Sequence, residues 1–333
     1  MGTIRRHFTG AVALLALSTA LPFAAQPAKA QDLPVEPGVF KLAISPWLGY
    51  GMWYIAQEKG FFKANGLEGV ELTNFVEDKD MGAAVAAGQV DGDNESIQQL
   101  LAKVQAGIPI KGVLLLDAST KADAILVNGD IKTVADLKGK QVAFERGSTS
   151  DLLLNYVLQK NGMTIDDVNV LPMPAASAGT AIISGTVPAA VTYEPYISAA
   201  IGADKNIKVL AEAGEAPGLI SDVLSVPEET LKKKPGQVQA MLKSWDQALE
   251  YYRAHTEEGR AIIAKGVGAE PADLATAFDG VSYYSASESQ KALNGVFKSD
   301  TYPGIVKAAI AAKLIDKDIA YDAAIGSTVA HWK

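Results

Sequence analysis

Short apolar runs of strand length alternate with amphipathic stretches of helical spacing over most of the chain. The run 40–44 is the first, and a Ser-Pro pair ends it, because proline disfavours helical backbone at the residue before it. From Met52 the apolar residues recur with helical spacing until Gly60, a predicted stop. The segment 47–51, two aromatic residues among glycines, lies between them. We predict a strand, an aromatic loop and a helix, the start of a βα unit.

The same alternation continues as far as Pro227, after which only helices are predicted. The run 110–116 is almost continuously apolar, which is typical of a strand buried on both faces. Strands alternating with helices predict parallel βαβ units and an α/β fold. The further strands are predicted near 70–76, 90–94, 124–127, 141–144, 168–171, 189–192, 207–210 and 224–226.

The strands fall into two sets, which predicts two α/β lobes. We assign residues 31–122 and 223–333 to the first lobe and residues 123–222 to the second, so that the chain crosses between them twice. Open α/β sheets bind ligands beyond the carboxyl ends of their strands. The cleft between the lobes is therefore the predicted binding site.

The first 30 residues have the features of a cleaved signal peptide. Arg5 and Arg6 form a basic start, an apolar run follows at 11–21, and Ala28-Lys29-Ala30 is a small-x-small cleavage site. The apolar run is too short to span a bilayer, although an uncleaved anchor is the alternative. The leader holds three basic residues and no acid, so its removal takes the net charge from −8 to −11. Such an acidic chain is a poor partner for nucleic acid or an anionic membrane.

The chain has no cysteine, which excludes disulfides, thiol chemistry and the lipid attachment of a bacterial lipoprotein. We therefore expect the mature protein to be free in the periplasm.

Several short motifs resemble, in the same order, those of periplasmic solute-binding proteins of ABC transporters, in the nitrate/sulfonate/taurine and thiamine-precursor branch. The resemblance covers about residues 40–297. Each motif is weak alone, but their shared order is specific. The motifs are Ser45-Pro-Trp-x-Gly-Tyr with Glu58-Lys-Gly-Phe-Phe, Ala86-Ala-Gly-Gln-Val-Asp, Asp136-Leu-Lys-Gly-Lys-Gln-Val-Ala with the following Gly147-Ser-Thr-Ser, Tyr193-Glu-Pro-Tyr, and Ser221-Asp-Val-Leu.

The resemblance implies a two-lobe type II periplasmic binding protein fold, a hinged clamshell. It implies a protein that binds a small-molecule solute and delivers it to ABC transporter permease subunits, and we expect a monomer. Carried over position by position, the predicted ligand-binding residues are Trp47, Tyr50, Glu95, Ser96, Asp117, Gly147, Ser148, Thr149, Tyr193, Glu194 and Asp222. For each of them a purely structural role, as core, helix cap or hinge brace, is the alternative.

The candidate cleft is rich in acids and aromatic rings. Four carboxylates repel each other unless a positive group offsets them or some are protonated. An ammonium or a nitrogen-rich ring can stack on the aromatic rings and donate hydrogen bonds to the acids. We hypothesise a small organic solute bearing an amine, amidine or aminopyrimidine, with a sulfonate, taurine or nitrate-type anion as the alternative.

Two other classes of function are rivals to solute delivery. The thiamine-pyrimidine synthases, which the resemblance places on the same fold, rely on cysteines and histidine, and this chain has no cysteine and three histidines. No Ser-His-Asp set or metal-ligand spacing occurs, so no catalytic residue, metal or cofactor is predicted. A sensory protein that docks on a receptor is the other rival, because both roles depend on the closed state.

Overall fold

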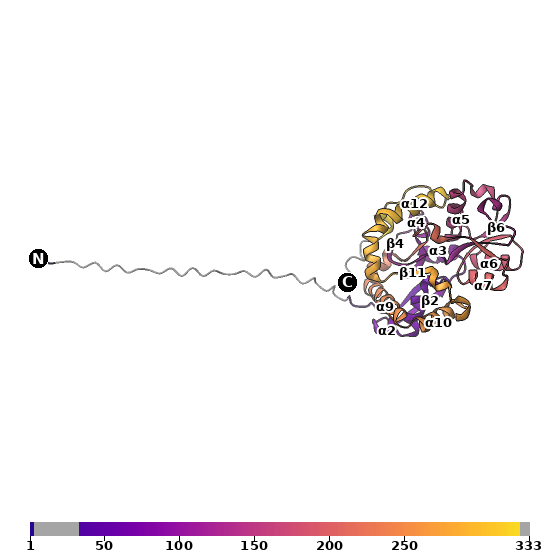
Figure 1. The fold of residues 1–333 in the computed structure, drawn as a ribbon. Coiled ribbons are helices and arrows are strands. Elements are labelled where there is room, and N and C mark those ends of the chain that lie inside the picture. Colours follow the sequence, from indigo (N-terminus) through magenta and orange to yellow (C-terminus); the bar gives the residue numbers. More distant parts are fainter. Residues whose placement is uncertain (3–32, 327–333) are drawn as a thin grey trace.

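The structure is a computed structural model that describes residues 1–2 and 33–326. It has two lobes, each built around one β-sheet (Figure 1). The predicted signal peptide lies outside the described residues, apart from its first two. In the part of the chain that the structure describes, no helix is both long and apolar enough to cross a membrane.

The first lobe contains a six-stranded sheet in the order β11-β4-β10-β3-β1-β2. The second contains a five-stranded sheet in the order β7-β6-β8-β5-β9. The strands of the first sheet are β1 Val39–Ile44, β2 Gly69–Asn74, β3 Gly92–Ser96, β4 Ile110–Ser119, β10 Ser221–Pro227 and β11 Val281–Tyr283. Those of the second are β5 Asp123–Val127, β6 Gln141–Phe144, β7 Asn169–Pro172, β8 Ala189–Tyr193 and β9 Lys208–Glu212.

Helices cover both sheets, and the C-terminal helices pack on the first lobe (Figure 1). The α-helices are α1 Gly51–Glu58, α2 Phe61–Ala64, α3 Asp78–Ala86, α4 Ile97–Gln105, α5 Thr149–Lys160, α6 Ala175–Ile183, α7 Tyr196–Ala203, α8 Glu228–Lys233, α9 Pro235–Ala254, α10 Thr256–Val267, α11 Ala286–Leu293, α12 Tyr302–Ala311 and α13 Tyr321–Ala324. Short 3₁₀ turns include η1 Leu48–Tyr50, η2 Val134–Leu137, η5 Pro271–Leu274 and η6 Ala277–Gly280, and Phe297–Thr301 is a π-helical turn.

The prediction of parallel strands was wrong in part, because both sheets are mixed. Strand β10 runs antiparallel to β3 and β4, and β5 runs antiparallel to β8 and β9. The crossings explain this. The chain leaves the first sheet at the cleft end of β4 and re-enters it at that same end as β10, so these two strands must run in opposite directions.

Smaller differences arise where short segments were assigned by periodicity alone. The helices predicted at 131–139 and 271–278 are 3₁₀ turns, and β11 was not predicted because it has only three residues.

The two crossings between the lobes lie side by side. The backbone N–H of Ser119, at the end of β4, donates to the carbonyl oxygen of Ile220, just before β10, at 3.0 Å. The N–H of Glu194, after β8, donates to the carbonyl oxygen of Ala122 at 2.9 Å. These bonds tie the crossings to each other and to the second sheet; the domain boundaries at 122 and 222 stay predictions.

The packing of α1 against α9 anchors the aromatic segment 47–51, which leads directly into α1. Trp53 of α1 and Trp245 of α9 are fully buried, with ring centroids 4.8 Å apart. The indole N–H of Trp245 donates to the carbonyl oxygen of Tyr284 at 2.8 Å. This pair anchors the helix that begins directly after the aromatic segment.

We predict that Trp245→Ala lowers the free energy of unfolding by about 3–5 kcal/mol, because it leaves a large cavity in a closely packed core. Chemical denaturation measures this change. Val296→Ala is the control, since that side chain is 63% exposed, and should change the free energy by less than about 0.5 kcal/mol. Equal effects of the two substitutions would contradict the assigned packing.

Candidate functional site

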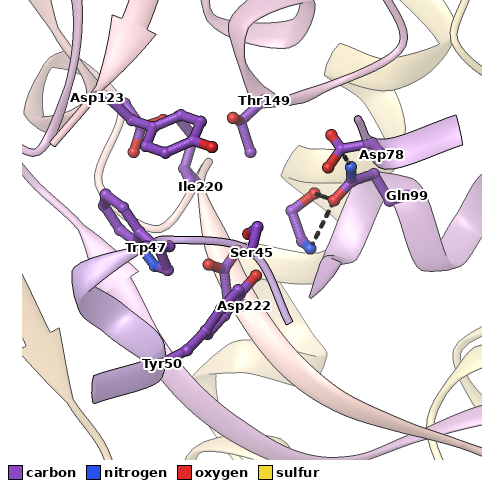
Figure 2. A pocket seen from close by; sticks show the side chains of 11 residues that line it. Ser45, Trp47, Tyr50, Asp78, Gln99, Asp123, Thr149, Ile220 and Asp222 are labelled. Carbon is purple, nitrogen blue, oxygen red and sulfur yellow. Dashed lines mark hydrogen bonds between the residues drawn. The ribbon is translucent and has the colours of Figure 1, made fainter. Parts of the chain in front are cut away.

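A cavity lies between the two sheets, where the carboxyl ends of several strands meet. The space that a water-sized sphere can enter is only about 30 Å³, within about 350 Å³ of non-atom space that includes the open mouth, so a solute larger than a few waters requires the lobes to move apart. Figure 2 shows side chains from both lobes pointing into it. The lining residues are Ser45, Trp47, Tyr50, Asp78, Ser96, Gln99, Asp123, Thr149, Tyr193, Ile220 and Asp222.

Strand register aligns polar side chains at the cleft edge of each sheet. In the first sheet Asp222 of β10 pairs with Asp117 of β4 on one side and with Ser96 of β3 on the other. In the second sheet Asp123, the first residue of β5, pairs with Tyr193, the last residue of β8. Residues far apart in the sequence therefore form two short rows at the cleft edges of the sheets, and all of them except Asp117 line the cavity.

Aromatic rings from both lobes form one wall of the cavity. Trp47 of the first lobe meets Tyr193 of the second edge to face, with ring centroids 5.7 Å apart. The indole N–H of Trp47 donates to Oδ1 of Asp117 at 3.2 Å, and the hydroxyl of Tyr283 donates to the carbonyl oxygen of Leu48 at 2.9 Å. These bonds fix the η1 turn, so Trp47 and Tyr50 are held rigidly even though both line the cavity.

Three carboxyl groups line the cavity, from Asp78, Asp123 and Asp222 (Figure 2). Burial raises the pKa of Asp78 and of Asp123 to about 7. Burial, with the neighbouring charge of Asp117, raises the pKa of Asp222 well above its usual value. Oδ2 of Asp123 and Oδ1 of Asp222 are buried without a hydrogen-bond partner among the described residues. These oxygens are hydrogen-bond acceptors that the described residues leave without a partner.

No lysine or arginine is among the described residues that line the cavity. The charge of Lys103 on α4 acts on the Asp78 carboxylate and partly offsets the effect of burial on its pKa. Lys103 itself contacts Asp93 and lies 2.8 Å from Glu95, both on β3. Its ion pairs are therefore formed inside the first lobe, although its charge reaches one acid of the cavity.

Gln99 links the two lining helices of the first lobe. Its Oε1 accepts from the backbone N–H of Ser96 at 2.9 Å and from the Ser96 hydroxyl at 2.6 Å. Its Nε2 donates to the Asp78 carboxylate (Figure 2). Helix α4 therefore orients Asp78, which stands in the first turn of α3.

Of the predicted ligand-binding residues, six line the cavity: Trp47, Tyr50, Ser96, Thr149, Tyr193 and Asp222. Glu95 does not, because side chains alternate along a strand and the one after it, Ser96, faces the cleft. Asp117 lies behind Trp47, where its fully buried carboxylate accepts the indole N–H.

The other three predicted residues cap helices. The N–H of Gly147 donates to Asp151 at 3.0 Å, and the Ser148 side chain accepts from the N–H of Ser150 at 3.1 Å. The Glu194 carboxylate accepts from the backbone N–H and the hydroxyl of Ser198, at 3.0 and 2.9 Å. Each of these contacts stabilises the start of a helix. Gly147, Ser148 and Glu194 are not among the residues that line the cavity.

Sequence reasoning missed Ser45, Asp78, Gln99, Asp123 and Ile220. Only Asp123 carried a usable signal, since it immediately precedes a predicted buried strand at the crossing. Asp78 begins a predicted helix, and acids are common there for reasons of helix stability alone.

Comparisons with known proteins show the family to which the chain belongs. The family described as NMT1/THI5 like matches residues 49–259. The chain is 27% identical to a putative binding protein of Brucella abortus (strain 2308) over 278 residues, 79% of this chain and 80% of that protein. It is 31% identical to a putative aliphatic sulfonates-binding protein of Escherichia coli (strain K12) over 199 residues, 59% of this chain and 61% of that protein.

Solved structures confirm the predicted two-lobe periplasmic binding protein fold. The alkanesulfonate-binding protein SsuA from Xanthomonas axonopodis pv. citri, bound to MOPS, superposes with a TM-score of 0.66 at 22% identity. The match covers 84% of this chain and 99% of that one. At this level of identity the likeness concerns the fold alone.

We predict that Gly49→Ala disturbs the aromatic wall. A Cβ at this position would lie 2.1 Å from Nε1 of Trp47 and 2.2 Å from Oδ2 of Asp117, so the indole and the carboxylate must move apart. The expected loss is about 1–3 kcal/mol in the free energy of unfolding, with a change in tryptophan fluorescence.

Gly202→Ala is the matched control for this substitution. Gly202 stands on the exposed face of α7, where a Cβ meets nothing within 4 Å. Alanine there should leave the fluorescence unchanged and stabilise the helix by up to about 1 kcal/mol. The close packing of Gly49 against Trp47 and Asp117 would be contradicted if Gly49→Ala also left the fluorescence and the free energy of unfolding unchanged.

Proposed function

The chain belongs to the NMT1/THI5-like family, and from that premise we propose that it captures a small amine-bearing cation by lobe closure and delivers it to an ABC permease. The relatives named as binding proteins support the general role, and the lining of the cavity supports the class of solute. The proposed place of action is the periplasm, with the protein acting as a monomer.

One observation carries the proposal: three carboxyl groups meet aromatic rings in a cavity that no lysine or arginine lines among the described residues. An ammonium, amidinium or aminopyrimidine can donate to the unpartnered oxygens of Asp123 and Asp222. The same cation gains about 0.5–2 kcal/mol from each ring that it contacts face on. Charge and hydrogen bonding therefore both favour a nitrogen-containing cation as the ligand.

A sulfonate or similar anion is the second candidate, because relatives carry that name. Ionised carboxylates would repel it, so such an anion would bind well only when the acids hold their protons and donate hydrogen bonds. The raised pKa values of Asp78 and Asp123 make that protonated form accessible near neutral pH. The two candidates therefore differ in the sign of their pH dependence.

We expect closure to involve rotation about the paired crossings near Ser119 and Ile220. A solute that touches acids and rings of both lobes favours the closed form by its differential affinity for it. Stimulation of ATP hydrolysis by the reconstituted permease would separate transport from a sensory role. A catalytic role is not proposed, because the lining contains no cysteine or histidine that could act as in the thiamine-pyrimidine synthases.

We predict that isothermal titration of the mature chain detects benzamidine, benzylamine or an aminopyrimidine, and detects ethanesulfonate, taurine and nitrate weakly or not at all. Asp222→Asn should weaken binding of the cation about 10- to 100-fold, because it removes an acceptor that becomes charged when the cation displaces its proton. Asp130→Asn, at an exposed position, is the charge-matched control and should bind as the wild type does. Tight binding of a plain sulfonate with no amine bound would refute the amine proposal.

We predict that affinity for benzamidine, which stays protonated near neutral pH, rises as pH increases from 6 to 8. The cation displaces protons that Asp78 and Asp123 hold up to about pH 7, so the affinity changes by at most about tenfold per pH unit for each proton.

We predict the opposite trend for the stability of the ligand-free chain, whose free energy of unfolding should fall as pH increases. The folded chain holds protons that the unfolded chain releases near pH 4, so these groups contribute stability that is lost as pH rises to about 7.

Titration calorimetry and thermal unfolding at several pH values measure both trends. An affinity that increases on acidification would instead support the anion.

A further inference from the structure

Glu145 connects the two lobes at the cavity without lining it. It follows β6 in the second lobe, and its two carboxylate oxygens accept from different lobes. Oε1 accepts the backbone N–H of Asp78, the first residue of α3 in the first lobe, at 3.0 Å. Oε2 accepts the backbone N–H of Ala175, the first residue of α6 in the second lobe, at 3.2 Å.

The physical basis of this bridge is the exposed amide at the start of a helix. The first N–H groups of a helix have no partner within it, and that end carries a partial positive charge that favours a carboxylate. Glu145 satisfies two such groups at once. The neighbouring bases have their own ion-pair partners, since Lys79 pairs with Glu77 and Arg146 lies 3.9 Å from Asp151, although the charge of Lys79 also acts on Glu145.

A second interaction at the same place opposes closure. The Asp78 carboxylate lines the cavity on the same helical turn that Glu145 contacts. Burial raises the pKa of Asp78, and the charge of Glu145 adds to this effect. When both groups are ionised in the empty closed form they repel each other, and a cation beside Asp78 would offset that repulsion.

We propose that Glu145 is a positioning residue that latches the closed form by joining α3 to α6, and that the repulsion from Asp78 couples the latch to a bound cation. The second half of this inference rests on the proposed function; the first half concerns the chain alone. Without the latch the closed form loses its hydrogen-bonded connection across the cavity on the side of α3.

The test uses the absence of natural cysteine in this chain. Ala83→Cys on α3 and Thr180→Cys on α6, both at exposed positions, allow a pair of spin labels to be placed across the cleft. Distance distributions are recorded for the mature chain, for Glu145→Ala, for Glu145→Gln and for the exposed control Glu71→Gln. Each is measured without ligand and with benzylamine.

Glu145→Ala should shift the ligand-free distribution to longer distances and should speed benzylamine release about tenfold. Glu145→Gln, which keeps one neutral acceptor, should lie between it and the wild type, and it is the variant to use if the alanine variant does not fold. Glu71→Gln should match the wild type.

Unchanged distances in both Glu145 variants would overturn the latch. Longer distances in a protein that binds neither benzylamine nor any other amine would uphold the latch and refute the amine-binding function. If the Glu145 substitutions change the distances with a bound sulfonate as much as they do with benzylamine, the proposed coupling to a cation is wrong.

Discussion

The central constraint on this protein is the burial of several carboxyl groups in one cleft whose described lining holds no basic side chain. A buried carboxylate is stable only when hydrogen bonds or an opposite charge replace the water that it loses. At the cavity the structure supplies neither in full, since oxygens of Asp123 and Asp222 remain without partners among the described residues. The raised pKa values of Asp78 and Asp123 are the direct consequence. Such a site is unfavourable when empty and ionised, and it becomes favourable when a ligand supplies donors or positive charge.

Inside the first lobe, two buried acids have a lysine partner. Asp93 and Glu95 are fully buried on β3, but Lys103 contacts both. This ion triad ties α4 to β3 and thereby holds Ser96 and Gln99 at the cavity. The acids of β3 therefore have a lysine partner inside the lobe, whereas Asp78, Asp123 and Asp222 line the cavity without a basic side chain among its described lining residues, and this position is the main reason to assign them to a ligand.

The two lobes meet through contacts of different character around the cavity. The hydrogen-bonded crossings keep the lobes attached whether or not a ligand is present. The Trp47–Tyr193 contact and the Glu145 bridge exist only when the lobes are close together. In the proposed mechanism, repulsion among the acids opposes those contacts, and a bound cation shifts the balance toward the closed form.

The sequence by itself determined the order of strands and helices, the two-lobe architecture and the aromatic segment, because periodicity and motif order are local properties of the chain. It also indicated the acidic and aromatic character of the cleft, and Trp47, Tyr193 and Asp222 do line the cavity. Only the tertiary structure decided which acids reach the cavity. Glu95 and Ser96 are neighbours in sequence, yet strand alternation turns them to opposite faces, and the pairing of Glu95 with Lys103 becomes visible only when α4 packs on β3. Asp78 and Glu145 are far apart along the chain, and their meeting across the cleft depends on how the two lobes close, which no local pattern records.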